Sequence, residues 1–132
     1  MKGLITVQSD YPVKETIDRV SSIVQSKGMT VFLRMDHAEN ATKQGLQLRA
    51  TELILFGNPK AGTVLMQDNQ ISGIDLPLKM LAWQDEEEKV WLTYTDVAYL
   101  AEKHNLAEKS SSIVKAIEEG ITLVANAATK KS

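Results

Sequence analysis

The residues best suited to chemistry form a turn between a strand and a helix, from Gly57 to Thr63. The apolar run that precedes it is typical of an interior strand, and a Gly-Asn-Pro sequence ends that strand before helical spacing begins. Asn58 can cap a helix and Pro59 suits its first turn, so the backbone N–H groups that follow can face a ligand. With the cation of Lys60 beside them, these groups could hold an anion.

The same turn has a purely structural interpretation. It could be a well-formed strand-to-helix junction in which Gly62 lets the helix pack closely on the sheet. It is not a phosphate-binding P-loop, because the required spacing of glycines, lysine and serine or threonine is absent. Nearby charged residues could add a ligand floor or a cross-strand ion network. The candidate ligand-binding residues are Arg34, Glu52, Asn58, Lys60, Ala61, Gly62, Thr63 and Lys79.

Catalysis is the alternative function, and its candidates are weaker. His37 or Glu52 could act as a base for a small acidic or carbonyl-containing metabolite, with Lys79 or Lys60 as the electrostatic partner. Asp36 precedes His37 directly, but neighbours on a strand face opposite ways and cannot form a dyad there. The catalytic residues therefore stay unknown. With two histidines and no cysteine, we expect no metal site and no cofactor.

Composition limits the class of protein. The chain has 132 residues, a formal net charge of -2 and no cysteine. This length suits a single domain over residues 1–127, followed by a frayed tail at 128–132. The slightly acidic balance argues against nucleic acid as a partner. No run approaches the roughly 20 apolar residues of a membrane span, so we expect no membrane partner and a cytoplasmic location.

The pattern of elements predicts an α+β fold. Strands expected at 4–8, 30–36, 51–56, 78–83 and 90–94 alternate unevenly with a helix from Pro12 to Lys27, a short helix from Pro59 and two C-terminal helices. The order is β-α-β-β-α(short)-β-β-α-α, which favours a curved, mainly antiparallel sheet with its helices on one face. The last helix carries an apolar stripe made of Ile113, Ala116, Ile117, Ile121 and Val124.

Each face of this sheet has an expected set of side chains. Beneath the helices we expect Val31, Leu33, Leu53, Leu55 and Leu92. On the open face we expect Phe32, Arg34, Asp36, Glu52, Lys79 and Trp91. Such a mixture of apolar and charged groups suits a subunit interface or a ligand floor.

Several segments together resemble a prokaryotic domain-of-unknown-function family, number three hundred and two. They are Glu52, Phe56-Gly57-Asn58-Pro59-Lys60-Ala61-Gly62-Thr63, Leu65-Met66, Ile74-Asp75-Leu76-Pro77-Leu78-Lys79 and Val90-Trp91-Leu92-Thr93-Tyr94. The resemblance implies a TATA-binding-protein-like α+β fold and a tendency to form dimers, and it implies no activity. The fold name suggests DNA, but the acidic run from Asp85 to Glu88 and the net charge do not suit a DNA-bending saddle.

These observations leave three hypotheses open. The first is a homodimeric module that binds a small anionic molecule, or a partner, at the Asn58 turn and the open sheet face. The second is the enzyme described above. The third is a structural partner subunit, which would have a broad apolar patch and no pocket.

Overall fold

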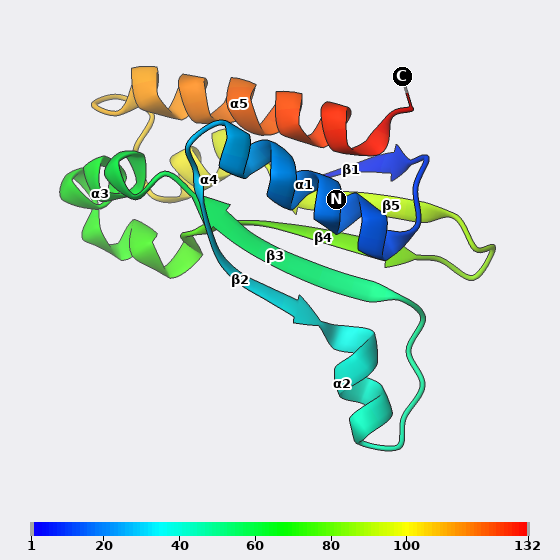
Figure 1. The fold of residues 1–132 in the computed structure, drawn as a ribbon. Coiled ribbons are helices and arrows are strands. Elements are labelled where there is room, and N and C mark those ends of the chain that lie inside the picture. Colours follow the sequence, from blue (N-terminus) through cyan, green and yellow to red (C-terminus); the bar gives the residue numbers. More distant parts are fainter. Residues whose placement is uncertain (1, 132) are drawn as a thin grey trace.

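The structure is a computed structural model that describes residues 2–131. One antiparallel sheet of five strands runs in the spatial order β1-β5-β4-β3-β2, with helices packed on one face (Figure 1). The strands are β1 (Leu4–Ser9), β2 (Thr30–Asp36), β3 (Thr51–Gly57), β4 (Leu78–Gln84) and β5 (Val90–Thr95). The helices are α1 (Val13–Ser26), α2 (His37–Lys43), α3 (Pro59–Asp68), the 3₁₀ helix η1 (Gln70–Asp75), α4 (Val97–Lys103) and α5 (Ser111–Thr129). The predicted α+β class and antiparallel sheet are confirmed.

The core lies between α1, α5 and the covered face of the sheet. Helix α1 forms because apolar residues recur at spacings of four, three and four, and all four of them are buried: Val13, Ile17, Val20 and Val24. They pack on side chains that point from the central strands, namely Ile54, Phe56, Met80, Ala82, Leu92 and Tyr94. The connection from β1 to β2 carries α1 across the sheet, since these two strands form its opposite edges.

The assignment of side chains to sheet faces was partly wrong. Glu52, Ile54 and Phe56 point toward the helices, so Leu53 and Leu55 lie on the open face. A register shift between Val31 and Leu33 leaves Val31 against the core and turns Leu33 outward. Because side chains alternate along a strand, an offset of one residue exchanges the two faces completely. An apolar run such as Leu53 to Phe56 does not reveal which alternative holds.

The predicted frayed tail is also corrected. Helix α5 continues to Thr129, and Ala128 and Thr129 are fully buried. Arg19 donates hydrogen bonds to the carbonyls of Ala127 and Ala128, and the backbone N–H of Asp10 donates to the Thr129 carbonyl at 2.7 Å. The end of α5 is therefore fixed to the segment between β1 and α1. Ser132 lies outside the described residues.

Two elements leave this compact arrangement. Helix α2 projects from the end of β2, away from the helical layer (Figure 1). Helices α3 and η1 form a separate lobe at the end of the sheet, between β3 and β4 in the chain (Figure 1). Between residues 2 and 131, no helix has both the length and the apolarity needed to cross a membrane.

Candidate functional site

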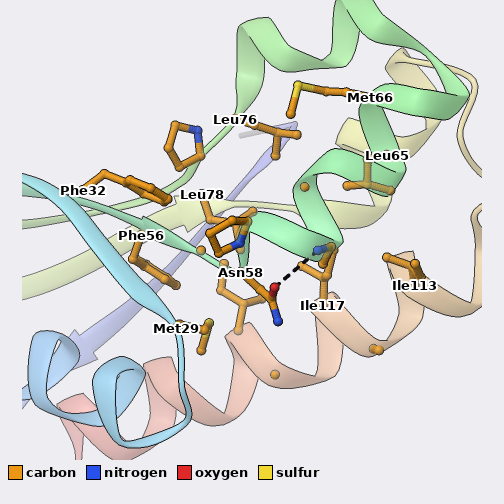
Figure 2. Close-up of a pocket in the computed structure, with 18 of the residues that line it drawn as sticks. Met29, Phe32, Phe56, Asn58, Leu65, Met66, Leu76, Leu78, Ile113 and Ile117 are labelled. Carbon is orange, nitrogen blue, oxygen red and sulfur yellow. Dashed lines mark hydrogen bonds between the residues drawn. The ribbon is translucent and has the colours of Figure 1, made fainter.

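A pocket of about 510 Å³ lies where the α3 and η1 lobe meets α5 and the ends of the strands (Figure 2). Pockets of this size are typical of small-molecule sites. The sheet contributes Phe32, Phe56 and Leu78, and the turn before β2 contributes Met29. The lobe contributes Leu65, Met66 and Leu76.

Helix α5 supplies one long wall. Its lining residues are Ile113, Ala116, Ile117, Gly120 and Ile121, which recur at the spacing of one helical face. The predicted stripe of α5 is therefore divided between two environments. Val124 lies in the core away from the pocket, Ile121 belongs to the core and also lines the pocket, and Ile113, Ala116 and Ile117 line the pocket. This stripe was read from the sequence, but nothing in it distinguished a core contact from an open space.

Two lining residues are glycines inside α-helices, Gly62 in α3 and Gly120 in α5. A Cβ atom added at either position would meet no heavy atom within 4 Å. The structural interpretation of Gly62, a close approach of helix to sheet, is therefore wrong. Glycine within a helix is about 1 kcal/mol less favourable than alanine, so neither residue is explained by stability or by packing. What each glycine does is leave space in the pocket.

The pocket is almost entirely apolar. Of the lining residues, all within the described part of the chain, Asn58 is the one whose side chain can form hydrogen bonds. Its Oδ1 accepts from the N–H of Lys60 at 2.9 Å. It also accepts from the N–H of Ala61 at 3.3 Å, the bond drawn in Figure 2. This is the predicted N-cap of α3. Because both acceptor bonds use the oxygen, the Nδ2 donor group remains for another partner.

The predicted anion-binding turn has a different geometry from the one expected. The N–H groups of Lys60 and Ala61 are capped by Asn58, and that of Gly62 donates to the Asn58 carbonyl at 2.9 Å. The hydroxyl of Thr63 donates to the Pro59 carbonyl. Asn58, Ala61 and Gly62 line the pocket, whereas Lys60 and Thr63 are exposed outside it. Anion binding at this turn stays a prediction, with three of its amides already paired.

The charged candidates were expected to share the open face of the sheet, and they lie on two different faces. Arg34 and Glu52 lie on the helix side of the sheet, where Arg34 donates to Glu52 Oε2 at 2.8 Å and to Asp18 of α1 at 2.9 Å. Lys79 lies on the opposite face, in register with Leu55, and its Nζ reaches backbone carbonyls at 3.3 and 3.4 Å. Because Arg34 pairs with Asp18 of α1 and with the buried Glu52 of β3, these residues join α1 to the sheet.

The histidines also lie apart from these groups. Asp36 caps α2 by accepting from the N–H of Glu39, as a polar strand end would, and His37 begins that projecting helix. His104 is buried at the end of α4, where its Nε2 lies 2.5 Å from Asp75 Oδ2. The enzyme hypothesis requires the candidate base and cations to converge on one pocket, and they do not.

Polar contacts hold the lobe from behind the pocket. Asp75, at the end of η1, also meets the ammonium of Lys103 at 3.1 Å. The hydrogen bond from His104, together with the nearby Lys103, lowers the pKa of the Asp75 carboxyl below its ordinary value of 3.8. Ser110, before α5, donates to Asp68 at 2.7 Å. The wall formed by α3 and η1 is thus fixed to α4 and to the start of α5.

Sequence reasoning missed most of the pocket. Met29, Leu76 and Ile117 come from separate elements, and only their folded arrangement brings them to one space. One signal was available, because Gly120 interrupts an otherwise strong helix without a turn.

Proteins of similar sequence carry this domain within longer chains. The chain is 52% identical over 118 residues to "Fluoride-specific ion channel FluC 1" of Brucella suis biovar 1 (strain 1330), covering 89% of this chain and 46% of that protein. The same identity and coverage of this chain hold for "Fluoride-specific ion channel FluC 2" of Brucella melitensis biotype 1 (strain ATCC 23456 / CCUG 17765 / NCTC 10094 / 16M), of which 44% is covered. The chain thus spans about half the length of these relatives.

A solved structure has the same fold. It is an uncharacterized conserved DUF302 protein from Bacillus stearothermophilus, with a TM-score of 0.84 and 19% identity over 97% of this chain and 99% of that one. The model of the family "Domain of unknown function DUF302" matches residues 5–126, nearly the whole described chain. The resemblance inferred from the Gly-Asn-Pro and Asp-Leu-Pro segments is therefore confirmed, and the chain belongs to the DUF302 family.

Proposed function

We propose that this domain is a binding module that holds a small, largely apolar molecule in the pocket between α3, η1 and α5. The observation that supports this most directly is the pair of helix-interior glycines, Gly62 and Gly120, which face open space in an apolar pocket of about 510 Å³. A folded protein fills its interior closely, and an apolar space of this size with glycine walls suits an occupant.

The lining determines what kind of molecule suits the pocket. No ionisable side chain contributes to it within residues 2–131, so a charged group placed inside would lose its hydration without a counter-ion. The proposal therefore keeps the small-molecule module expected from the sequence and replaces the anion by an apolar body. It also makes the module non-catalytic, since a general base within reach of the ligand is a requirement of the enzyme alternative.

The direct experiment is native mass spectrometry of the protein purified from its own host. We expect a retained small molecule that is released on unfolding and extracts into organic solvent. To link it to the pocket, we would compare Gly120→Leu, which fills the space, with Ala127→Leu, which adds the same side chain at an exposed position of α5. Ligand retained equally by both variants would exclude this pocket as its site.

We propose also that the domain is a homodimer that pairs through the open face of its sheet. This face presents apolar side chains from the four adjacent strands β2 to β5. A broad apolar surface of this kind usually marks an interface with another protein chain. They are Leu33, Met35, Leu53, Leu55, Leu81, Trp83 and Trp91. Light scattering at micromolar concentration should give twice the mass of one chain, and Leu53→Glu should halve it. A monomeric mass for the unchanged protein would reject the dimer.

A second candidate function concerns fluoride. We propose that the domain works beside a fluoride-specific channel in the cytoplasm, because proteins 52% identical over 89% of this chain are named as such channels. This chain spans about half of their length, so channel activity itself is not transferred to it. Deleting this gene should lower the fluoride concentration that the host tolerates during growth. Deleting the host's fluoride-channel gene should lower it too. Unchanged tolerance on deleting this gene would remove the link.

A further inference from the structure

The pocket has a definite shape, which limits its occupant further than apolarity alone. The five α5 residues that line it extend from Ile113 to Ile121, and at 1.5 Å per residue this wall is about 12 Å long. Helix α3 lines the other side through Ala61, Gly62, Leu65 and Met66. The space is therefore a trough between two helices, with strand ends as its floor (Figure 2). An elongated ligand fits such a trough better than a compact one.

The distribution of polar groups gives the ligand a direction. Asn58 is exposed to solvent, whereas Phe56 and Leu65, which also line the trough, are buried. One end of a bound molecule can thus lie beside Asn58 at the rim, with the rest against carbon and sulfur atoms. The chemistry of the cap fixes which part of Asn58 is available. Oδ1 must be the atom that accepts from the two backbone N–H groups, so Nδ2 is the free one.

A free amide N–H₂ group can only donate, and it therefore selects a ligand with an acceptor oxygen. No hydrogen bond from Asn58 Nδ2 to another of residues 2–131 occupies it. The apolar walls include two methionines, Met29 and Met66, whose flexible side chains adjust to chains of different shape. An oxygen acceptor at the end of a flexible apolar chain is the chemistry of an acyl group.

We propose that the trough takes an acyl chain laid along α5, with its carbonyl oxygen accepting a hydrogen bond from Asn58 Nδ2 at the rim. This assignment rests on the proposed binding function and names the class of ligand for the same pocket. The chain can come from a free fatty acid or from a membrane lipid, since the carboxylate of the first and the ester carbonyl of the second both place an acceptor oxygen at the end of an acyl chain. Phe32, which lines the pocket and is 49% exposed, and the exposed Ile74 of η1, next to the lining residue Gly73, make this side of the molecule apolar outside the trough as well.

The test uses NMR of the methionine methyl groups, with three probes added to the whole protein after delipidation: methyl palmitate, palmitate and the rigid hydrocarbon pyrene. We expect methyl palmitate to shift Met29 and Met66, and to leave Met35 on the open sheet face unchanged. Shifts with pyrene but with neither acyl probe would overturn the acyl assignment while leaving an apolar-binding function intact. No shift with any probe would reject both.

The role of Asn58 is tested by Asn58→Asp, which keeps an equally good capping oxygen and removes the donor. We expect the affinity for methyl palmitate to fall about five- to tenfold, as for the loss of one hydrogen bond, with the melting temperature unchanged or higher. The matched control is Lys60→Gln, at the next-but-one position and outside the pocket, which should leave the affinity unchanged. Equal affinities of Asn58→Asp and the unchanged protein would overturn the proposal as stated.

A last comparison distinguishes the two sources of the chain. Phospholipid vesicles, added in place of palmitate, should transfer lipid that co-purifies with the protein if the acyl chain belongs to a membrane lipid. Uptake of palmitate without uptake from vesicles would assign the pocket to free fatty acids. Uptake of neither, with delipidated protein that still binds pyrene, would count against the acyl chain.

Discussion

Replacing Gly120 by alanine should make the ligand-free protein more stable. Gly120 lies near the middle of α5, and a Cβ there would meet nothing within 4 Å, so the substitution brings the helical preference of alanine without a steric cost. That preference is worth about 1 kcal/mol, and the same reasoning applies to Gly62 in α3. For a domain of this size, the gain corresponds to a rise of roughly 3 to 5 °C in melting temperature. The two sites are on different helices, so their effects should nearly add.

Gly28 provides a matched control for this reasoning. A Cβ at Gly28 would also meet nothing within 4 Å, but the residue ends α1 with a φ of +80°. Alanine there would have to adopt a left-handed conformation that costs about 1 to 2 kcal/mol, so Gly28→Ala should lower the melting temperature.

The assay is thermal unfolding of delipidated protein followed by circular dichroism, with retention of apolar ligand measured on the same samples. We expect Gly62→Ala and Gly120→Ala to raise the melting temperature and to reduce ligand retention together, because each methyl group occupies part of the pocket. Destabilisation by both substitutions would refute the claim that these glycines face open space. Stabilisation with full ligand retention would refute the claim that they are there for the ligand.

Three further predictions follow from the polar contacts. Asp75→Asn should loosen the α3 and η1 lobe and lower stability at neutral pH. Contacts with His104 and Lys103 lower the pKa of Asp75 in the folded protein. The stability that this carboxylate contributes is therefore present above its ordinary pKa of 3.8 and is lost as the pH falls through the lower folded value. Melting curves of the variant and the unchanged protein should stay apart at pH 6 and converge at strongly acidic pH. Arg34→Met should lower the free energy of unfolding in urea by about 3 kcal/mol, because it leaves the buried Glu52 carboxylate unpaired. Asp18→Asn, at the half-exposed end of the same network, should lower it by less than about 1 kcal/mol. Equal losses would contradict the assignment of Glu52 as the buried partner. Amide NMR with millimolar fluoride, phosphate or acetate should leave Lys60, Ala61 and Gly62 unshifted, since their N–H groups are already paired, and saturable shifts there would restore the anion hypothesis.

The sequence predicted the order of elements better than their orientation. Periodicity identified α1 and α5, and turn residues separated the strands, because those signals are local. The faces of β3 were assigned the wrong way round, since Leu53, Ile54, Leu55 and Phe56 are all apolar and either alternation is consistent with them. The decisive information was Glu52, which is buried through its contact with Arg34. Most carboxylates on strands face outward, and the pairing that reverses this preference for Glu52 comes from another strand.

The candidate site shows the same limit in a stronger form. The Asn58 turn was found from the sequence, and it does border the pocket, but its polar atoms mostly complete the helix cap rather than meet a ligand. An apolar stripe such as that of α5 predicts that a helical face is covered, and it does not say by what. Protein atoms cover Val124, whereas Ile113, Ile117 and Ile121 pack on the protein and also border the open pocket. Gly120 is the residue of this stripe that packing alone does not explain, because alanine there would make the helix more stable without a steric clash.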